Sequence, residues 1–323
     1  MDLQTLQDIS DNIKDVFDTQ FEYSNTNLVP NYEDTNLTYE RGQIKKGKRI
    51  KTCVLYIDIR NSVNLSKESP REFIGQLYTG FVKAMLLVAD YHGGYVRNII
   101  GDRVMVVFPT YDCCTSAIEC AISMNTVAHH IIAVHAGVRT FKCGIGIDYG
   151  MMRVLKTGIV KQGKDRTSYK NLVWTGRAAN IASRLTDLAN KAIQQITYKV
   201  RYQPPRRRKL IRFTPSSPLY YIPSPVEEEY TPESFSQQIG WTEQSGLQFS
   251  KGTILNITKI EKEISYKPIL ITGSVFSGLV EENAEHESIA KGFWEEQKIG
   301  VKDYDGKVYG CNLTWKSANK IQY

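Results

Sequence analysis

Two aspartates occupy positions where a carboxylate could bind metal. Asp58 lies near the end of CVLYIDI (residues 53–59), an apolar segment typical of a buried strand, and Asp102 lies in a Gly-Asp turn between two further strand-like segments. A carboxylate at the end of a buried strand is costly unless it is paired or bound to metal. Two such carboxylates at adjacent strand ends can share a pair of Mg²⁺ ions. Because either aspartate alone could simply cap a turn, the pair carries the metal-site prediction.

The segment after Asp58 could hold phosphate. A strand-to-helix loop presents backbone N–H groups to phosphate oxygens. The residues concerned are Ile59, Arg60, Asn61, Ser62 and Val63. The segment is not a Walker loop, because the chain contains no GxxxxGK followed by Ser or Thr. Phosphate binding here is therefore a hypothesis that depends on the neighbouring residues.

A third set of polar side chains lies in GRAANIASRL. Asn180 and Arg184 are four positions apart, so on a helix they share one face. An amide beside a guanidinium can hold a ribose and a transferring phosphoryl group. Without the other residues, an exposed pair on a surface helix would be the simpler interpretation.

The elements that must position these residues follow a βαββαβ order, a ferredoxin-like α+β arrangement. Ser69 is the predicted N-cap of the first helix, with Pro70 as its first residue and Glu72 completing a capping box. A hairpin-like stretch at 153–174 and a helix from 176 to about 191 come next. The six core elements are a strand at 53–59, a helix at about 70–92, strands at 95–100 and 103–108, a helix at about 112–128 and a strand at 141–148.

The remaining segments suggest an N-terminal part, 1–50, and one domain, 51–323. Residues 3–18 predict an amphipathic helix whose apolar stripe packs on the chain's own core or, as we expect for the N-terminal part, on a partner subunit. Within the domain, core motifs span 53–192, and an insertion rich in Pro, Ser and Gln spans about 202–250. The C-terminal strands fall within 253–315, at 253–260, 269–276 and 307–315.

The composition is that of an ordinary globular protein. Hydrophobic residues make up 41% of the 323 positions, no apolar run has the length of a membrane span, and the N-terminus lacks the pattern of a secretory signal. Six cysteines without CxxC spacing favour reduced thiols, so we expect a cytoplasmic protein without membrane contact. The net charge of +7 attracts anions, but the basic run 206–209 lacks interleaved aromatics, which favours a solvated loop over nucleic-acid binding.

The sequence resembles a known family at three places. YIDIRNSV, RNIIGDRVMVVF and GRAANIASR, in this order and at these separations, resemble the class III adenylate/guanylate cyclase catalytic domain. The resemblance covers residues 50–192 well and 269–315 more weakly. It implies an enzyme, a phosphorus–oxygen lyase, that cyclises a nucleoside triphosphate. It also implies that Asp58 and Asp102 bind two divalent ions, Mg²⁺ or Mn²⁺, helped by the backbone carbonyl of Ile59.

The same resemblance assigns three further roles. Asn180 corresponds to the family's ribose-orienting asparagine, and Arg184 corresponds to its transition-state arginine. Lys302 matches the triphosphate-binding lysine, with Lys298 and Lys307 as alternatives. In this family one subunit supplies the metal aspartates and the other supplies the asparagine and arginine. Since this chain contains both sets, the resemblance implies a homodimer with two shared active sites.

The positions that read the base depart from the family pattern. Asn98 and Val173 stand where adenylate and guanylate cyclases carry their purine-reading side chains, and Tyr56 replaces a common phenylalanine. A short amide and an apolar side chain support fewer hydrogen bonds to a purine, while the tyrosine hydroxyl can either extend to a smaller base or narrow the pocket. The chain is thus most similar to the pyrimidine cyclases of bacterial Pycsar anti-phage systems.

That similarity implies conversion of CTP or UTP to cyclic CMP or cyclic UMP and pyrophosphate, with the product acting on an effector protein. Asn98 can donate and accept, so it does not separate the two substrates. Three alternatives remain: an adenylate cyclase with an atypical pocket, a silent nucleotide sensor, and, ranked last, a nucleic-acid-binding module. The presence of Asp58, Asp102, Asn180 and Arg184 argues against the silent sensor.

Overall fold

The computed structural model describes residues 1–161, 164–165, 169–205, 207–208, 220–242 and 246–322. The chain divides into two compact units. Unit 1 consists of Met1–Lys191 and Tyr266–Tyr323, and unit 2 of Ala192–Ser265. Every residue predicted to take part in chemistry lies in unit 1.

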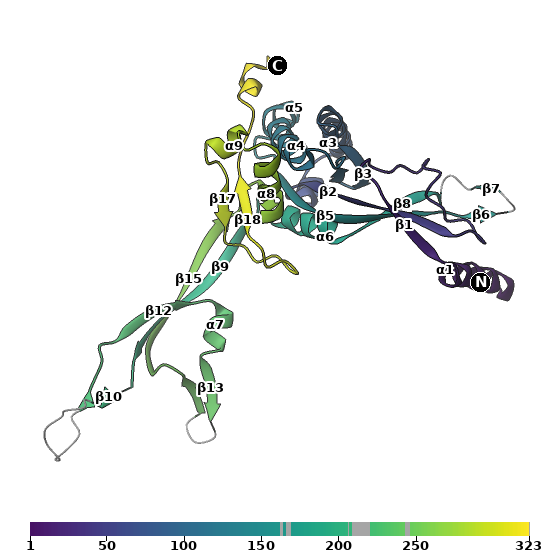
Figure 1. The fold of residues 1–323 in the computed structure, drawn as a ribbon. Coiled ribbons are helices and arrows are strands. Elements are labelled where there is room, and N and C mark those ends of the chain that lie inside the picture. The colour runs from purple at the N-terminus through teal and green to yellow at the C-terminus, as the bar shows by residue number, and fades with distance from the viewer. Residues whose placement is uncertain (162–163, 166–168, 206, 209–219, 243–245, 323) are drawn as a thin grey trace. The chain divides into compact units, whose positions relative to one another are not determined.

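A mixed sheet forms the centre of unit 1 (Figure 1). Its four core strands run antiparallel in the order β5-β2-β4-β3, which is the ferredoxin-like order and confirms the predicted fold class. β16, β18 and β17 continue the sheet beyond β5, while β1 pairs in parallel with β2 and β8 pairs with β5. The strands are β1 (Phe21–Asn25), β2 (Lys45–Ile59), β3 (Tyr95–Ile100), β4 (Arg103–Val107), β5 (Cys143–Thr157), β8 (Asn171–Thr175), β16 (Ile269–Thr272), β17 (Glu295–Gln297) and β18 (Val308–Cys311).

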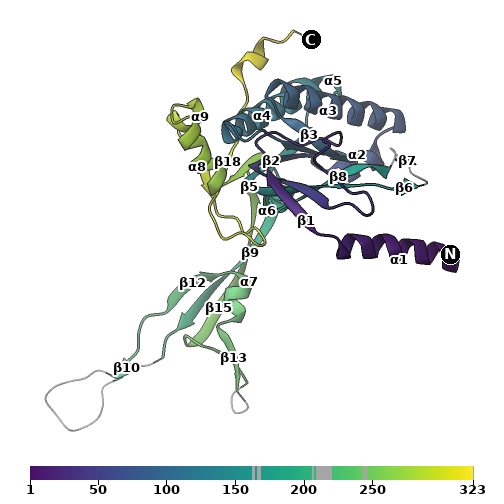
Figure 2. The same cartoon turned by 45° about the vertical axis from the view of Figure 1, so that its right-hand side comes forward.

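Helices cover both faces of this sheet (Figure 2). α3 (Arg71–Tyr91), α4 (Cys113–Val127) and α8 (Gly273–Glu282) pack on one face around a large apolar core. α6 (Arg177–Leu188) packs on the other face, where a Cβ at Gly146 would overlap the backbone of α6. The glycine therefore permits the close approach that holds α6 against β2 and β5.

The remaining elements of unit 1 are short or peripheral. They are α1 (Leu3–Asp18), α2 (Ser62–Glu68), the π-helical turn Ala128–Ile132, α5 (Ala133–His135), β6 (Val160–Lys161), β7 (Lys164–Asp165), α9 (Glu287–Ala290) and the 3₁₀ turn Lys316–Lys320. α1 confirms the helix predicted over 3–18.

Two local predictions were wrong. A short helix, α2, was missed, and Ser69 ends it as the C-cap instead of starting the next helix. Pro70 is itself the N-cap of α3, since a proline cannot continue α2 but its extended backbone suits a cap. Residues 273–276 were expected to be strand but begin α8, because Thr272 ends the strand in extended conformation as the helix N-cap.

Unit 2 has its own small core. β12 (Val226–Tyr230), β9 (Ala192–Gln203) and β15 (Thr253–Ser265) form an antiparallel sheet around Val200, Tyr202, Tyr230 and Phe249. Its strands begin at 192, ahead of the predicted insertion. The other elements are β10 (Arg207–Arg208), β11 (Tyr220–Tyr221), α7 (Pro232–Ser236), β13 (Ile239–Thr242) and β14 (Gly246–Phe249). Arg206 and Lys209 of the basic run lie outside the described residues.

Two helical stretches of unit 1 are long and apolar enough to cross a membrane by length and composition alone, Arg71–Tyr91 and Cys113–His135. Each contributes buried side chains to the core on the sheet, among them Phe81 and Met85 of the first and Ile118 of the second. The core helix of a soluble protein passes the same test.

The six cysteines are buried and free. The sulfur atoms of Cys53, Cys113 and Cys114 lie within 4.8 Å of one another between β2 and the start of α4. Burial raises the pKa of the Cys53 thiol well above its ordinary value. The protonated, neutral thiol of Cys53 is thus favoured.

Candidate active site

Asp58 and Asp102 lie together at one end of the sheet. β2 and β4 pair antiparallel, with Ile57 opposite Val104, so the end of β2 meets the β3–β4 turn. Burial and the negative charge of Asp58 raise the pKa of Asp102, and the hydroxyl of Ser62 offsets part of this effect. The two carboxylates are thus close enough to interact, which is the juxtaposition that the sequence predicted.

Arg103 neutralises one of the two carboxylates. Its Nη2 lies 2.7 Å from Asp58 Oδ2 and also contacts Asp187 of α6, while Nη1 donates to Ser183 Oγ at 2.9 Å. The sequence reasoning missed Arg103, although its place directly after Asp102 puts it opposite the end of β2. Asp58 thereby has a cationic partner, and α6 is tied to the metal end of the sheet.

Asp102 has no such partner. Its Oδ2 atom is covered and makes no hydrogen bond to any part of the chain that the structure describes. A buried, unpaired carboxylate oxygen beside a second carboxylate is unfavourable without a cation. Oxygen ligands of this kind suit Mg²⁺ or Mn²⁺, so the residues fit a divalent ion. Ile59, the last residue of β2, lies at the same strand end.

The predicted phosphate loop divides into two parts. The N–H group of Arg60 donates to the carbonyl of Lys142 at 2.8 Å, and its guanidinium contacts the carbonyl of Thr186. Burial lowers the pKa of Arg60. Arg60 therefore braces the end of β2 against α6, with its N–H group already used.

The second part of the loop turns outward. Asn61 has a left-handed backbone, with φ of 57°, and starts α2. Ser62 follows beside Asp102, and Val63 is 65% exposed. Of the five predicted residues, Ser62 lies nearest to the carboxylates by its contacts.

α6 presents a row of polar side chains together with a loop distant in sequence. Asn180 is exposed on α6. Arg184 Nη1 donates to the backbone carbonyl of Lys302, and the guanidinium pairs with Asp303 Oδ2 at 2.7 Å. Val301 and Tyr304 pack in one apolar cluster with Leu185 of α6, which seats this loop.

These contacts distinguish among the three candidates for the triphosphate-binding lysine, which are Lys298, Lys302 and Lys307. Lys307 Nζ is paired with Glu296 Oε2 at 2.9 Å. Within the described residues, Arg184 contacts the Lys302 segment and makes no recorded contact with Lys298 or Lys307. Lys302 is therefore the lysine that the fold brings beside Arg184.

Arg177 is a further basic residue on this side of α6. It precedes Asn180 by three positions and Arg184 by seven, so all three share one helix face. Arg177 Nη2 donates to Asp303 O at 3.3 Å, and its guanidinium lies 5.7 Å from the centroid of the Tyr304 ring. Helical spacing could have identified it from the sequence.

Two of the three predicted base readers fall in one row across the sheet. Tyr56 is opposite Met105, and Met105 is opposite Asn98, so all three side chains lie on the α6 face of the sheet. We call Tyr56, Met105 and Asn98 the base row. The Tyr56 hydroxyl lies 3.2 Å from Met105 Sδ, and Asn98 is exposed.

Val173 lies outside this row. Its neighbours Leu172 and Trp174 pack in the apolar cluster that includes Tyr56 and Met105. Because side chains alternate along a strand, Val173 faces the other way, and it is 44% exposed. The structure thus brings Trp174 beside the base row in place of Val173. Counting residues back from Gly176 in the sequence could not tell whether Val173 or Trp174 faces the cluster that includes Tyr56.

Comparisons with known proteins agree with the arrangement of these residues. The family model described as the adenylate and guanylate cyclase catalytic domain matches residues 44–207. A uridylate cyclase of Burkholderia cepacia is 33% identical over 184 residues, covering 55% of this chain and 76% of that protein. A uridylate cyclase of Rhodovulum sp. (strain MB263) is 26% identical over 214 residues, covering 61% of this chain and 83% of that protein.

Among solved structures, the adenylyl cyclase CyaB from P. aeruginosa matches with a TM-score of 0.48 and 16% identity, over 84% of this chain and 97% of that one. The conclusion rests on the family match, which spans both aspartates and α6, and on the 33% identity to the Burkholderia cepacia protein. The chain belongs to the adenylate and guanylate cyclase catalytic domain family and is a nucleotide cyclase, a lyase that acts on a nucleoside triphosphate.

Proposed function

We propose that this protein is a pyrimidine nucleotide cyclase that converts UTP to cyclic UMP and pyrophosphate, with CTP as the second candidate substrate. The base row carries the proposal, because Tyr56 fills space beside Met105 and Asn98 offers a short amide to a base in the same row. The names of the bacterial relatives, all uridylate cyclases, support UTP.

The reaction is an in-line displacement. The ribose 3′-hydroxyl oxygen bonds to the α-phosphorus, the bond from that phosphorus to the bridging oxygen of the β-phosphate breaks, and the hydroxyl proton leaves to solvent. Asp58 and Asp102 would hold divalent ions, which would supply the positive charge that acidifies the hydroxyl and neutralises the phosphates. Asn180 orients the ribose, Arg184 meets charge growing on the α-phosphoryl oxygens, and Lys302 holds the leaving pyrophosphate.

Arg103 has a supporting role in this proposal. It keeps the Asp58 carboxylate ionised and oriented before an ion binds, through the contact at 2.7 Å. Its second link, to Asp187 and Ser183, fixes α6 relative to the carboxylates. The charged side chains around the site are thus oriented before substrate arrives.

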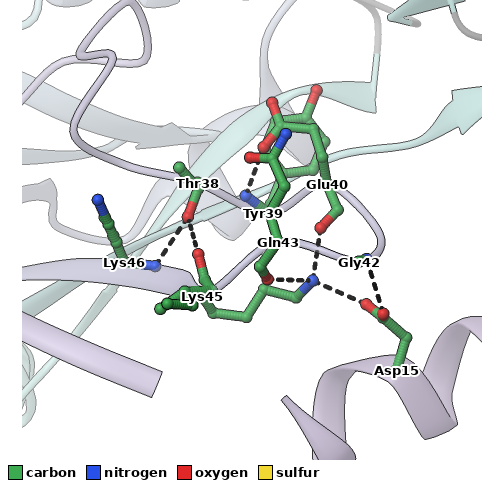
Figure 3. A network of polar contacts seen from close by, with 9 residues as sticks. Asp15, Thr38, Tyr39, Glu40, Gly42, Gln43, Lys45 and Lys46 are labelled. Atoms are coloured by element: carbon green, nitrogen blue, oxygen red, sulfur yellow. Dashed lines mark hydrogen bonds and ion pairs between the residues drawn. The ribbon is translucent and has the colours of Figure 1, made fainter. Parts of the chain in front are cut away.

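We further propose a homodimer in which α1 packs on the second copy. The apolar stripe of α1 is exposed in the isolated chain, from 46% at Ile9 to 83% at Phe17. The end of this helix is nevertheless fixed, because Lys45, which is 2% exposed, binds Asp15 Oδ2 at 2.7 Å and the carbonyls of Glu40 and Gln43 (Figure 3). A helix that is anchored at one end and exposes an apolar stripe suits a permanent interface with another protein chain.

Replacing Ile9 and Ile13 together by Asp tests whether α1 packs on the second copy of the chain. Light scattering after gel filtration should show a shift from dimer toward monomer, whereas the matched change of exposed Gln4 and Gln7 to Asp should leave the dimer intact. An unchanged dimer in the isoleucine variant would exclude α1 from the interface.

The substrate is tested with purified protein, Mn²⁺ and each of the four nucleoside triphosphates, with products separated by mass spectrometry. Cyclic UMP as the main product supports the proposal, and Arg184→Ala should abolish it. Cyclic AMP as the main product would replace the proposal with an adenylate cyclase that has an atypical pocket.

We also propose that the cyclic product is a second messenger in bacterial antiviral defence and acts on an effector protein. The support is the similarity to bacterial uridylate cyclases and the resemblance noted in the sequence. Phage plaque counts on cells carrying the native operon should rise when Asp58→Ala replaces the wild-type enzyme. Equal plaque counts on wild-type and Asp58→Ala cells would show that the cyclase activity does not contribute to phage defence.

A further inference from the structure

Arg97 occupies a β-bulge directly before Asn98. The register of β3 against β4 passes from Val96 opposite Val106 to Asn98 opposite Met105, so Arg97 has no residue opposite it. In a β-bulge one extra residue interrupts the alternation of side chains between the two faces of the sheet, so its side chain points in a different direction. The guanidinium lies 4.9 Å from the centroid of the Tyr95 ring and 6.0 Å from that of the Trp174 ring.

Arg97 and Trp174 both carry buried donors without an acceptor. Arg97 Nε and Trp174 Nε1 are covered and make no hydrogen bond within the described residues. The one recorded hydrogen bond of the Arg97 guanidinium, from Nη1 to the carbonyl of Val96, is long at 3.3 Å. Burial lowers the pKa of Arg97. A buried donor left unpaired is destabilising, so the two groups suit a bound molecule that supplies hydrogen-bond acceptors.

These donors lie next to the base row. Trp174 packs in the same apolar cluster as Tyr56 and Met105, and Arg97 precedes Asn98 while lying over the Trp174 ring. Neither Arg nor Trp can accept a hydrogen bond through its side chain. A bound group that pairs with both side chains would therefore have to present hydrogen-bond acceptors to them.

We propose that Arg97 and Trp174 select uracil over cytosine by donating hydrogen bonds to the carbonyl oxygens of the base. This inference rests on the proposed pyrimidine cyclase function. Uracil carries an acceptor, O4, where cytosine carries an amino donor, N4. The amide of Asn98 can turn over to suit either base, whereas donor-only side chains cannot. The amino group of cytosine would face these donors with a donor of its own, so it would leave Arg97 Nε without an acceptor.

The test compares kcat/KM for UTP and CTP in two variants. Arg97→Met keeps the apolar stem and removes all donors, and Trp174→Phe keeps a ring and removes its one donor. Loss of a hydrogen bond from a buried donor to the base lowers the UTP:CTP ratio of kcat/KM by about tenfold or more in Arg97→Met, and by about threefold or more in Trp174→Phe. A ratio within about twofold of the wild-type ratio in both variants overturns the proposal.

Arg49 supplies a matched control. Its Nε is also covered and unpaired within the described residues, but Arg49 lies in β2 opposite Arg153, at the other end of that strand from Asp58. Arg49→Met should leave the UTP:CTP ratio unchanged. An equal fall in that variant would mean that the ratio reports general loosening of the sheet and would overturn the proposal.

A change of substrate provides a second test, and its first result comes from the wild-type enzyme alone. In 4-thio-UTP sulfur replaces O4 and is a weak acceptor, so wild-type enzyme should prefer UTP to it, and Arg97→Met should lose this preference. Wild-type enzyme that uses UTP and its 4-thio analogue equally well would refute the inference while leaving the cyclase proposal intact. Wild-type enzyme that turns over neither pyrimidine triphosphate would instead refute the proposed function.

Discussion

Asp102→Asn should make the metal-free protein more stable while abolishing its activity. In the wild type, Asp102 Oδ2 is covered and unpaired, and the neighbouring Asp58 and burial both raise the pKa of Asp102. Asparagine removes the charge, and its amide N–H can donate to the Asp58 carboxylate. The substitution should therefore relieve an electrostatically unfavourable arrangement.

The expected size follows from the contacts. Leaving a buried polar group unpaired costs about 1–3 kcal/mol. For a unit of this size each kcal/mol shifts Tm by roughly 2 °C. Asp102→Asn should thus raise Tm in EDTA by roughly 2–6 °C. Asp58→Asn should instead lower Tm in EDTA, by roughly 2 °C, because it loses the ion pair with Arg103 at 2.7 Å.

Thermal unfolding is measured in EDTA and again with Mn²⁺. An ion at about 100 times its Kd stabilises the folded state by about 2.7 kcal/mol, so wild type should gain several degrees. Both asparagine variants should gain little, since each lacks one carboxylate ligand. A Tm of Asp102→Asn at or below that of wild type in EDTA would refute the reasoning about the unpaired oxygen. A full Mn²⁺ shift in that variant would remove Asp102 from the ion site.

Three further outcomes are expected. If the active sites are shared, mixing inactive Asp58→Ala and Arg184→Ala proteins restores about one quarter of wild-type activity, because half the dimers are mixed and each has one intact site; no recovery after proven exchange contradicts sharing. Lys302→Ala should lower kcat/KM by about tenfold or more and Lys307→Ala should not, as steady-state assays would show, because Lys307 is paired with Glu296; equal losses contradict this assignment. Burial raises the pKa of Asp148 above its ordinary value of 3.8, so folding stability falls as pH rises through the raised pKa. In Asp148→Asn the stability measured by urea unfolding should depend less on pH above 3.8, and an unchanged pH dependence contradicts this.

Much of the site could be predicted because its signals are local. Asp58 ends an apolar strand and Asp102 occupies a Gly-Asp turn, so strand and turn patterns alone located both. Asn180 and Arg184 share a face through helical spacing, which no distant part of the chain can alter. The βαββαβ order followed from the same short-range periodicities and agreed with the observed sheet order.

Other features depend on contacts between distant segments. The pairing of Arg103 with Asp58 and Asp187, and the seating of the Lys302 loop on Arg184, arise from packing across the fold. Trp174 and not Val173 packs in the cluster with Tyr56, because side chains along β8 alternate between the two faces of the sheet. Counting positions back from Gly176 does not tell which of these two residues faces the cluster. A one-residue bulge at Arg97 likewise leaves no clear mark in the sequence.

The sequence by itself therefore located two carboxylates, an amide and a guanidinium in short local patterns, and the resemblance to the cyclase family gave these residues their expected roles. Only the tertiary structure decided which carboxylate has a cationic partner, which lysine accompanies Arg184 and which side chains surround the base row. The reason is that burial, ion pairing and side-chain direction are properties of packed neighbours, and those neighbours come from parts of the chain far apart in sequence.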